Sequence, residues 1–141
     1  MKSLQELYHI AKHKNIVIDH FALSKREALS IMDLDGECFV AIDPQKISSE
    51  TDERNKLAHE LGHCITGAFY NPDYDCRQYH ENRADKWAIG QLISVDDLDE
   101  AVADGYCEIW ELAERFGVPE DFIKKTVCLY VHGNVATELY F

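Results

Sequence analysis

The chain has 141 residues, of which 46% are hydrophobic and 28% are charged, and its formal net charge is −12. This size and composition predict a single globular domain over residues 1–141. The negative charge disfavours direct nucleic-acid binding, because phosphate contacts need Lys and Arg. No apolar run reaches the roughly 20 residues of a membrane span, and the N-terminus lacks the hydrophobic segment of a signal peptide. We therefore expect a cytoplasmic protein without a membrane segment.

The first third of the sequence predicts one helix followed by a small β-sheet. Residues 3–14 place apolar side chains on one helical face, with Ser3 as the N-cap. A sheet is then expected over about residues 16–43. Its three strands are predicted within 15–21, 27–32 and 38–43, and the DLDGE segment at 33–37 is expected to join the last two as a hairpin.

The remaining two thirds predict mainly helices. A helix is expected within 48–67, because serine and acidic residues open it and Gly67 closes it. An irregular connection over 68–79 leads to a second helix over 80–93, and further helices are expected over about 95–131. The predicted class is therefore α+β, with a small N-terminal sheet and a mainly helical remainder.

The five cysteines stand at irregular spacings without a C-x-x-C pair, which argues against a cysteine zinc site. They are predicted to be reduced thiols that act as small apolar core residues. Cys64 directly follows His63, which is a candidate metal ligand, but successive side chains on a helix point about 100° apart, so Cys64 points away from His63. The five are Cys38, Cys64, Cys76, Cys107 and Cys128.

The sequence HELGH at 59–63 is the motif that carries chemistry. Histidines four apart on a helix differ by about 40° in direction and ~6 Å in height, so His59 and His63 can bind one tetrahedral metal ion. Glu60 lies beside this pair and is suited to act as a general base.

A catalytic zinc needs a third protein ligand. A histidine six residues after His63 is excluded, because that position is Phe69. On the next predicted helix, Glu81 and Asp85 stand four apart and share a face. Glu81 is predicted to be the third ligand, and Asp85 to accept the free ring N–H of a ligand histidine.

HELGH followed by ENRADKWA at 81–88 resembles the gluzincin arrangement of HExxH and then ExxxD. More specifically, the chain resembles the ImmA/IrrE family of metallo-endopeptidases (the DUF955 group) over roughly residues 5–95. It departs from the family pattern at Trp87, where Phe is usual, and at the LIS of 92–94, which replaces Leu-Met-Pro. Neither departure touches the predicted ligands.

The resemblance implies a zincin-like fold, one zinc ion per chain and a regulatory peptidase. Members of the family cleave or otherwise inactivate a helix-turn-helix repressor encoded nearby, often in phages and mobile elements. The implied partner is a basic protein, which suits the acidic chain. Glu60 would accept a proton from the attacking water and pass it to the leaving amine. The second oxyanion donor stays open among Tyr74, Tyr79, His80 and His132.

Two other functions remain as alternatives. A non-catalytic anti-repressor or interaction module could keep the fold and a structural metal site, but it would have no chemical need for Glu60. A DNA-binding regulator is suggested by LAERFGVPEDFIKK at 112–125, which has helix-turn-helix spacing. The second helix of that segment, which would be the recognition helix, offers only Lys124 and Lys125 as cations. Two packed helices, with Trp110, Leu112, Phe116 and Ile123 in the core, explain the same pattern.

Overall fold

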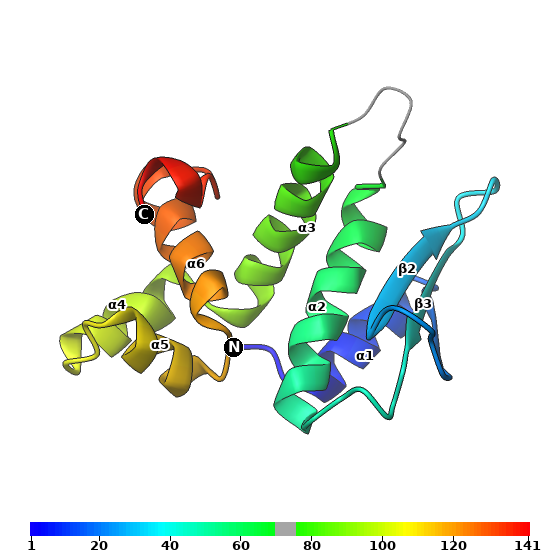
Figure 1. The fold of residues 1–141 in the computed structure, drawn as a ribbon, viewed down its shortest axis with the longest axis horizontal. Coiled ribbons are helices and arrows are strands. Elements are labelled where there is room, and N and C mark those ends of the chain that lie inside the picture. Colours follow the sequence, from blue (N-terminus) through cyan, green and yellow to red (C-terminus); the bar gives the residue numbers. More distant parts are fainter. Residues whose placement is uncertain (70–75) are drawn as a thin grey trace. The chain divides into compact units, whose positions relative to one another are not determined.

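The computed structural model describes residues 1–69 and 76–141, which form an α+β fold (Figure 1). The chain runs through a helix, a small sheet and then a series of helices, which confirms the predicted class. The described residues group into two compact units. One comprises Lys2–Ala88 and contains the sheet, and the other comprises Ile89–Phe141 together with Met1.

The first unit begins with a capped helix and a three-stranded sheet. Ser3 caps α1 by accepting a hydrogen bond from the backbone of Glu6, as expected. The strand order is β1-β3-β2, with β1 parallel and β2 antiparallel to β3. The predicted hairpin is confirmed, because the Asp33 N–H donates to the Glu37 carbonyl at 2.9 Å. The elements are α1 (Leu4–His13), β1 (Val17–His20), β2 (Ala28–Met32) and β3 (Cys38–Ile42).

Helix α2 (Glu50–Thr66) packs against β2 and β3, and α1 packs against α2. Val40 and Ile42 share one face of β3, because side chains alternate along a strand, and they are 2% and 0% exposed. Leu57 and Leu61, which lie one helical turn apart, are fully buried. The core of this unit therefore lies between the sheet and the helices.

Local signals at both ends of α2 explain its limits. Ser49 accepts a hydrogen bond from the backbone N–H of Asp52 at 3.0 Å, and Glu50, Asp52 and Glu53 favour the positive N-terminal end of the helix. The helix ends at Gly67, whose φ of 66° is accessible to glycine without steric cost.

Helix α3 (Arg77–Leu92) begins three residues earlier than predicted. Residues 77–79 are helical, whereas the sequence assigned them to the connection. Inside the sheet-containing unit, α3 approaches α2 closely at Gly62. A Cβ atom built on Gly62 would lie only 2.5 Å from the carbonyl oxygen of Ala84. Glycine is therefore required at this crossing.

The second unit contains α4 (Val95–Ala103), α5 (Ile109–Phe116), α6 (Glu120–His132) and a short 3₁₀ turn, η1 (Thr137–Leu139). Leu112, Phe116 and Ile123 are buried as expected. The expectation for Trp110 is wrong, because its side chain is 58% exposed. It lies two residues, about 200°, from Leu112 and thus on the opposite side of α5. None of the described helices is long and apolar enough to cross a bilayer.

The cysteine prediction is wrong for four of the five residues. Cys38 and Cys64 form a disulfide between β3 and α2, with their Cα atoms 5.8 Å apart. Cys76 and Cys107 are free but exposed, and Cys128 is free and buried, as predicted. The pairing depends on how the sheet and α2 pack, which spacing along the chain does not reveal.

Candidate metal centre

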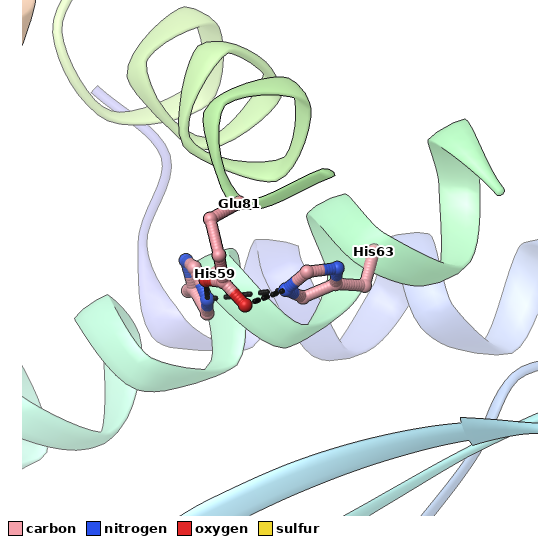
Figure 2. A group of neighbouring side chains, drawn as sticks. All are labelled: His59, His63 and Glu81. Carbon is pink, nitrogen blue, oxygen red and sulfur yellow. Dashed lines mark hydrogen bonds and ion pairs between the residues drawn. The ribbon is translucent and has the colours of Figure 1, made fainter. Parts of the chain in front are cut away.

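Three side chains from two helices converge in the sheet-containing unit (Figure 2). His59 and His63 project from α2, and Glu81 reaches them from α3. The two Nε2 atoms lie 3.2 Å apart. The carboxylate oxygens of Glu81 lie 2.9 Å from His59 Nε2 and 3.4 Å from His63 Nε2. One potential ligand atom from each of the three residues therefore lies within 4.8 Å of the other two.

These separations fit a tetrahedral metal ion. Ligand atoms bound at about 2.0–2.1 Å from a tetrahedral zinc are roughly 3.3–3.4 Å apart. The two Nε2 atoms, 3.2 Å apart, lie close to that value, and the Glu81 carboxylate reaches His59 with Oε2 at 2.9 Å and His63 with Oε1 at 3.4 Å. Two imidazoles and one carboxylate also form a known ligand set of catalytic zinc sites. The group is therefore compatible with a metal ion in both geometry and chemistry.

The hydrogen bonds around the two histidines leave Nε2 available on each ring. His59 Nδ1 donates to Asp85 Oδ1 at 2.8 Å, and His63 Nδ1 donates to the backbone carbonyl of Ala68. A ring whose Nδ1 carries the proton in this way presents the lone pair of Nε2 to a metal. Asp85 is 6% exposed, so the bond to His59 is shielded from water.

The electrostatics of the group favour positive charge at its centre. Burial lowers the pKa of His59, but its hydrogen bonds to Asp85 and Glu81 more than offset this effect and raise the pKa to about 10. Burial also lowers the pKa of His63, but the hydrogen bonds to Glu81 and to the Ala68 carbonyl outweigh this effect, so the net pKa is raised. The hydrogen bonds from both histidines hold the pKa of Glu81 well below its ordinary value. A cation is thus stabilised there.

The group opens onto a cavity of about 500 Å³. Glu60 lines this cavity and is only 7% exposed, so its carboxylate lies beside the histidines and away from bulk water. Ser30, on the edge strand β2, lines the same cavity. Arg26 and Arg77 add two cations to its wall. The cavity therefore combines the potential metal ligands, a candidate base and a strand edge.

The four candidate oxyanion donors occupy different places. His80 lines the cavity and is 9% exposed. Tyr79 is 58% exposed, and its ring meets that of His80 edge-on, with the ring centroids 5.2 Å apart. Tyr74 lies outside the described residues, and His132 belongs to α6 in the other unit.

The sequence did not single out several residues that shape the centre. The acceptor for His63 is the backbone carbonyl of Ala68, and a backbone group leaves no residue-type signal. Ser30 lies on β2, Arg26 in the loop before that strand and Arg77 at the start of α3, and their approach depends on the tertiary fold. Gly62 did carry a signal, because a glycine inside a helix is unfavourable unless close packing requires it.

A family model described as the IrrE N-terminal-like domain matches residues 26–127 of the chain. The chain belongs to this family. The match includes every residue of the potential metal group, and it extends further into the C-terminal helices than the resemblance over about 5–95. A comparison with curated proteins found no significant match.

Membership in the IrrE N-terminal-like family supports a metallopeptidase-like role. The group of His59, His63 and Glu81 gives this role a physical basis, because a peptidase of this kind needs a metal held by protein side chains.

Proposed function

We propose that this IrrE N-terminal-like chain is a zinc-dependent endopeptidase with His59, His63 and Glu81 as metal ligands. The observation that carries the proposal is the convergence of one ligand atom from each of the three residues within 4.8 Å of one another, with the two Nε2 atoms 3.2 Å apart, which suits tetrahedral zinc. Asp85 supports His59 by fixing its tautomer. A zinc ion bound there would supply Lewis acidity to the scissile carbonyl and to water.

Glu60 is the general base in this mechanism. Its buried carboxylate faces the cavity from the same helix as both histidines. It accepts the proton of the attacking water and then transfers it to the amine that leaves. His80 donates a hydrogen bond to the oxyanion that develops on the carbonyl. Among the four candidate donors, it is the one for which a cavity-lining position is described.

The edge of β2 is suited to hold the substrate backbone. The Asp33 N–H donates to the Glu37 carbonyl, and at the other end of β2 the Asp43 N–H donates to the Glu27 carbonyl. Residues 27 and 33 therefore stand at hydrogen-bonded positions, and antiparallel pairs alternate between bonded and non-bonded types. Ser30 therefore belongs to a non-bonded pair with Val40, and its backbone N–H and C=O point away from β3. In the described part of the chain, β2 pairs with β3 alone. An extended peptide can add to this edge beside the metal group.

The substrate is a basic helix-turn-helix repressor encoded beside the gene. The resemblance to ImmA/IrrE proteins suggests this class of substrate, and the net charge of −12 favours a basic partner over nucleic acid. Such a protein acts in the cytoplasm, in the regulation of a phage or mobile element. The alternative is an anti-repressor that binds the same partner without cleaving it.

The test is to incubate the zinc-loaded protein with the purified repressor and to follow cleavage by mass spectrometry. Glu60→Gln removes the base and keeps the size of the side chain. Glu50→Gln is the matched control, because Glu50 is an exposed residue at the start of the same helix. Cleavage by the wild type and the control, but not by Glu60→Gln, supports the peptidase. Tight binding by all three without cleavage would instead support the anti-repressor.

A further inference from the structure

The disulfide between Cys38 and Cys64 joins the sheet to the helix that carries both histidines. Cys38 is the first residue of β3, and Cys64 lies in the last turn of α2, directly after His63. The two cysteines are 26 positions apart in the sequence, so the bond closes a loop that contains most of α2.

Cys38 and Cys64 both line a second cavity, of about 280 Å³. This cavity shares no lining residue with the cavity at the metal group. The cysteines are only 6% and 8% exposed. Direct attack by the thiol of a large protein is therefore hindered, whereas a small molecule can enter the cavity. Lys14 and Glu37 also line it and are both exposed. One cation and one anion suit a small thiol that carries a carboxylate and an ammonium group.

The position of the disulfide couples it to the metal group. His63 lies in the last turn of α2, and its ring is held by the carbonyl of Ala68 just beyond the end of that helix. On one side α2 is fixed against α3 by the close contact between Gly62 and Ala84. The disulfide fixes the same segment to β3. When the bond opens, the turn that orients His63 loses its covalent anchor, and turns at helix ends are prone to local opening.

We propose that the Cys38–Cys64 disulfide is a thiol-exchange site for small zwitterionic thiols, such as cysteine-containing peptides, and that its redox state sets the affinity of the neighbouring metal group. The second half of this statement rests on the proposed metal site. The thiolate of the small molecule attacks one Sγ atom, which forms a mixed disulfide and releases the other cysteine as a thiolate. A second small thiol then attacks the mixed disulfide. Overall, two small thiols become one small disulfide, and the protein gains two thiols.

The first test maps thiols in the folded, full-length protein, using reduced glutathione as the probe. Before reduction, iodoacetamide should label Cys76 and Cys107, which are exposed, but not Cys38 or Cys64. After treatment with glutathione, Cys38 and Cys64 should also become labelled. Labelling of both before reduction, or resistance of the bond to millimolar glutathione, would overturn the exchange site.

The charges in the cavity allow a sharper comparison. Lys14→Gln should slow reduction by glutathione several-fold but leave reduction by neutral mercaptoethanol unchanged. Equal effects on both thiols would refute the proposed zwitterionic ligand, since neutral mercaptoethanol cannot pair with Lys14.

The second test measures coupling to the metal group. Reduction should weaken zinc binding about tenfold in competition with a chromogenic chelator, a loss at the lower end of that seen when ligand support is removed. Oxidised glutathione should restore the affinity. The double variant Cys38→Ser/Cys64→Ser should behave like the reduced protein and ignore glutathione. The double variant Cys76→Ser/Cys107→Ser is the matched control and should keep the full response.

A readout that needs neither zinc nor catalysis separates this proposal from the proposed function. Amide hydrogen exchange of residues 60–67 should speed up on reduction, and the exchange in α1 should not change. Equal exchange and equal zinc affinity in the two redox states would refute the coupling. An absence of peptidase activity in both states would count against the proposed function and leave these readouts intact.

Discussion

Replacement of Gly62 by alanine should damage the metal group without touching any of its ligands. The added Cβ would lie 2.5 Å from the carbonyl oxygen of Ala84 and 3.0 Å from its carbonyl carbon and Cα. An ordinary C···O contact is no shorter than about 3.3 Å, so the two helices must separate by roughly 0.8 Å. All three opposing atoms belong to the backbone, which means that α3 itself has to move.

The size of the effect follows from the position of Glu81, which is three residues before Ala84 on α3 and moves with it. Metal–ligand distances tolerate deviations of only about 0.2 Å, so a displacement of this size weakens the bond from Glu81. We expect at least a tenfold loss of zinc affinity, which corresponds to about 1.4 kcal/mol. The overpacking costs about 1–3 kcal/mol of folding stability, and the better helix propensity of alanine offsets part of it.

The assay is chelator competition for zinc, with thermal unfolding of the zinc-free protein measured by circular dichroism. Gly90→Ala is the matched control, because Gly90 lies in the same helix α3 and its added Cβ would meet no atom within 4 Å. The control should bind zinc like the wild type and gain about 0.5–1 kcal/mol of stability. Zinc affinity of Gly62→Ala within twofold of the wild type would refute the reasoning.

Three further predictions concern the chemistry of the centre. Asp85→Asn removes the charge that His59 Nδ1 faces at 2.8 Å, so zinc affinity should fall about 10–100-fold in chelator competition; an unchanged affinity would mean that Asp85 does not support the ligand. His80→Ala should lower kcat on a cleaved substrate by about 10²–10³-fold and leave zinc stoichiometry intact, whereas a loss of zinc would assign His80 to the metal group instead. In the zinc-free protein the pKa of His59 is raised from 6.5 to about 10, so the folded state holds more protons than the unfolded chain between these pH values. The stabilisation that protonated His59 provides is complete below about pH 6.5 and is lost as the pH rises towards 10. The Tm of the zinc-free protein should therefore fall across this window, and the fall should be smaller in Asp85→Asn. A Tm that stays constant or rises over that range in the wild type would contradict this assignment.

Helical periodicity accounts for part of what the sequence predicted at the site, whereas the approach of Glu81 and Asp85 to the histidines was predicted from the need for a third metal ligand and from the resemblance to the family. Spacings of four residues place His59 near His63, and Glu81 near Asp85, whatever the rest of the chain does. The hairpin between β2 and β3 was equally local, since a five-residue turn joins the two strands. These features follow from short-range rules, and the structure contains them all.

The features that escaped prediction depend on contacts between distant segments. β3 lies between β1 and β2, and no local sequence pattern predicts that β1 pairs with it in parallel. The Cys38–Cys64 bond needs β3 and α2 to pack in one particular way before the sulfur atoms can meet. Trp110 was misassigned because apolar character alone does not identify the buried side of a short helix.

The mixed sheet has a consequence for the order in which the protein folds. The hairpin pairs β2 with β3 across a short turn, so little chain entropy is lost when these two strands meet. The parallel partner β1 is separated from β3 by the whole of β2 and its flanking loops, and its pairing closes a longer segment. Contacts between distant positions form more slowly than local ones. The hairpin should therefore act as the early nucleus, with α2 packing on it, and the N-terminal helix and strand should dock late. Core substitutions in β3 would then slow refolding, whereas those in α1, such as Leu7→Ala, would mainly speed unfolding.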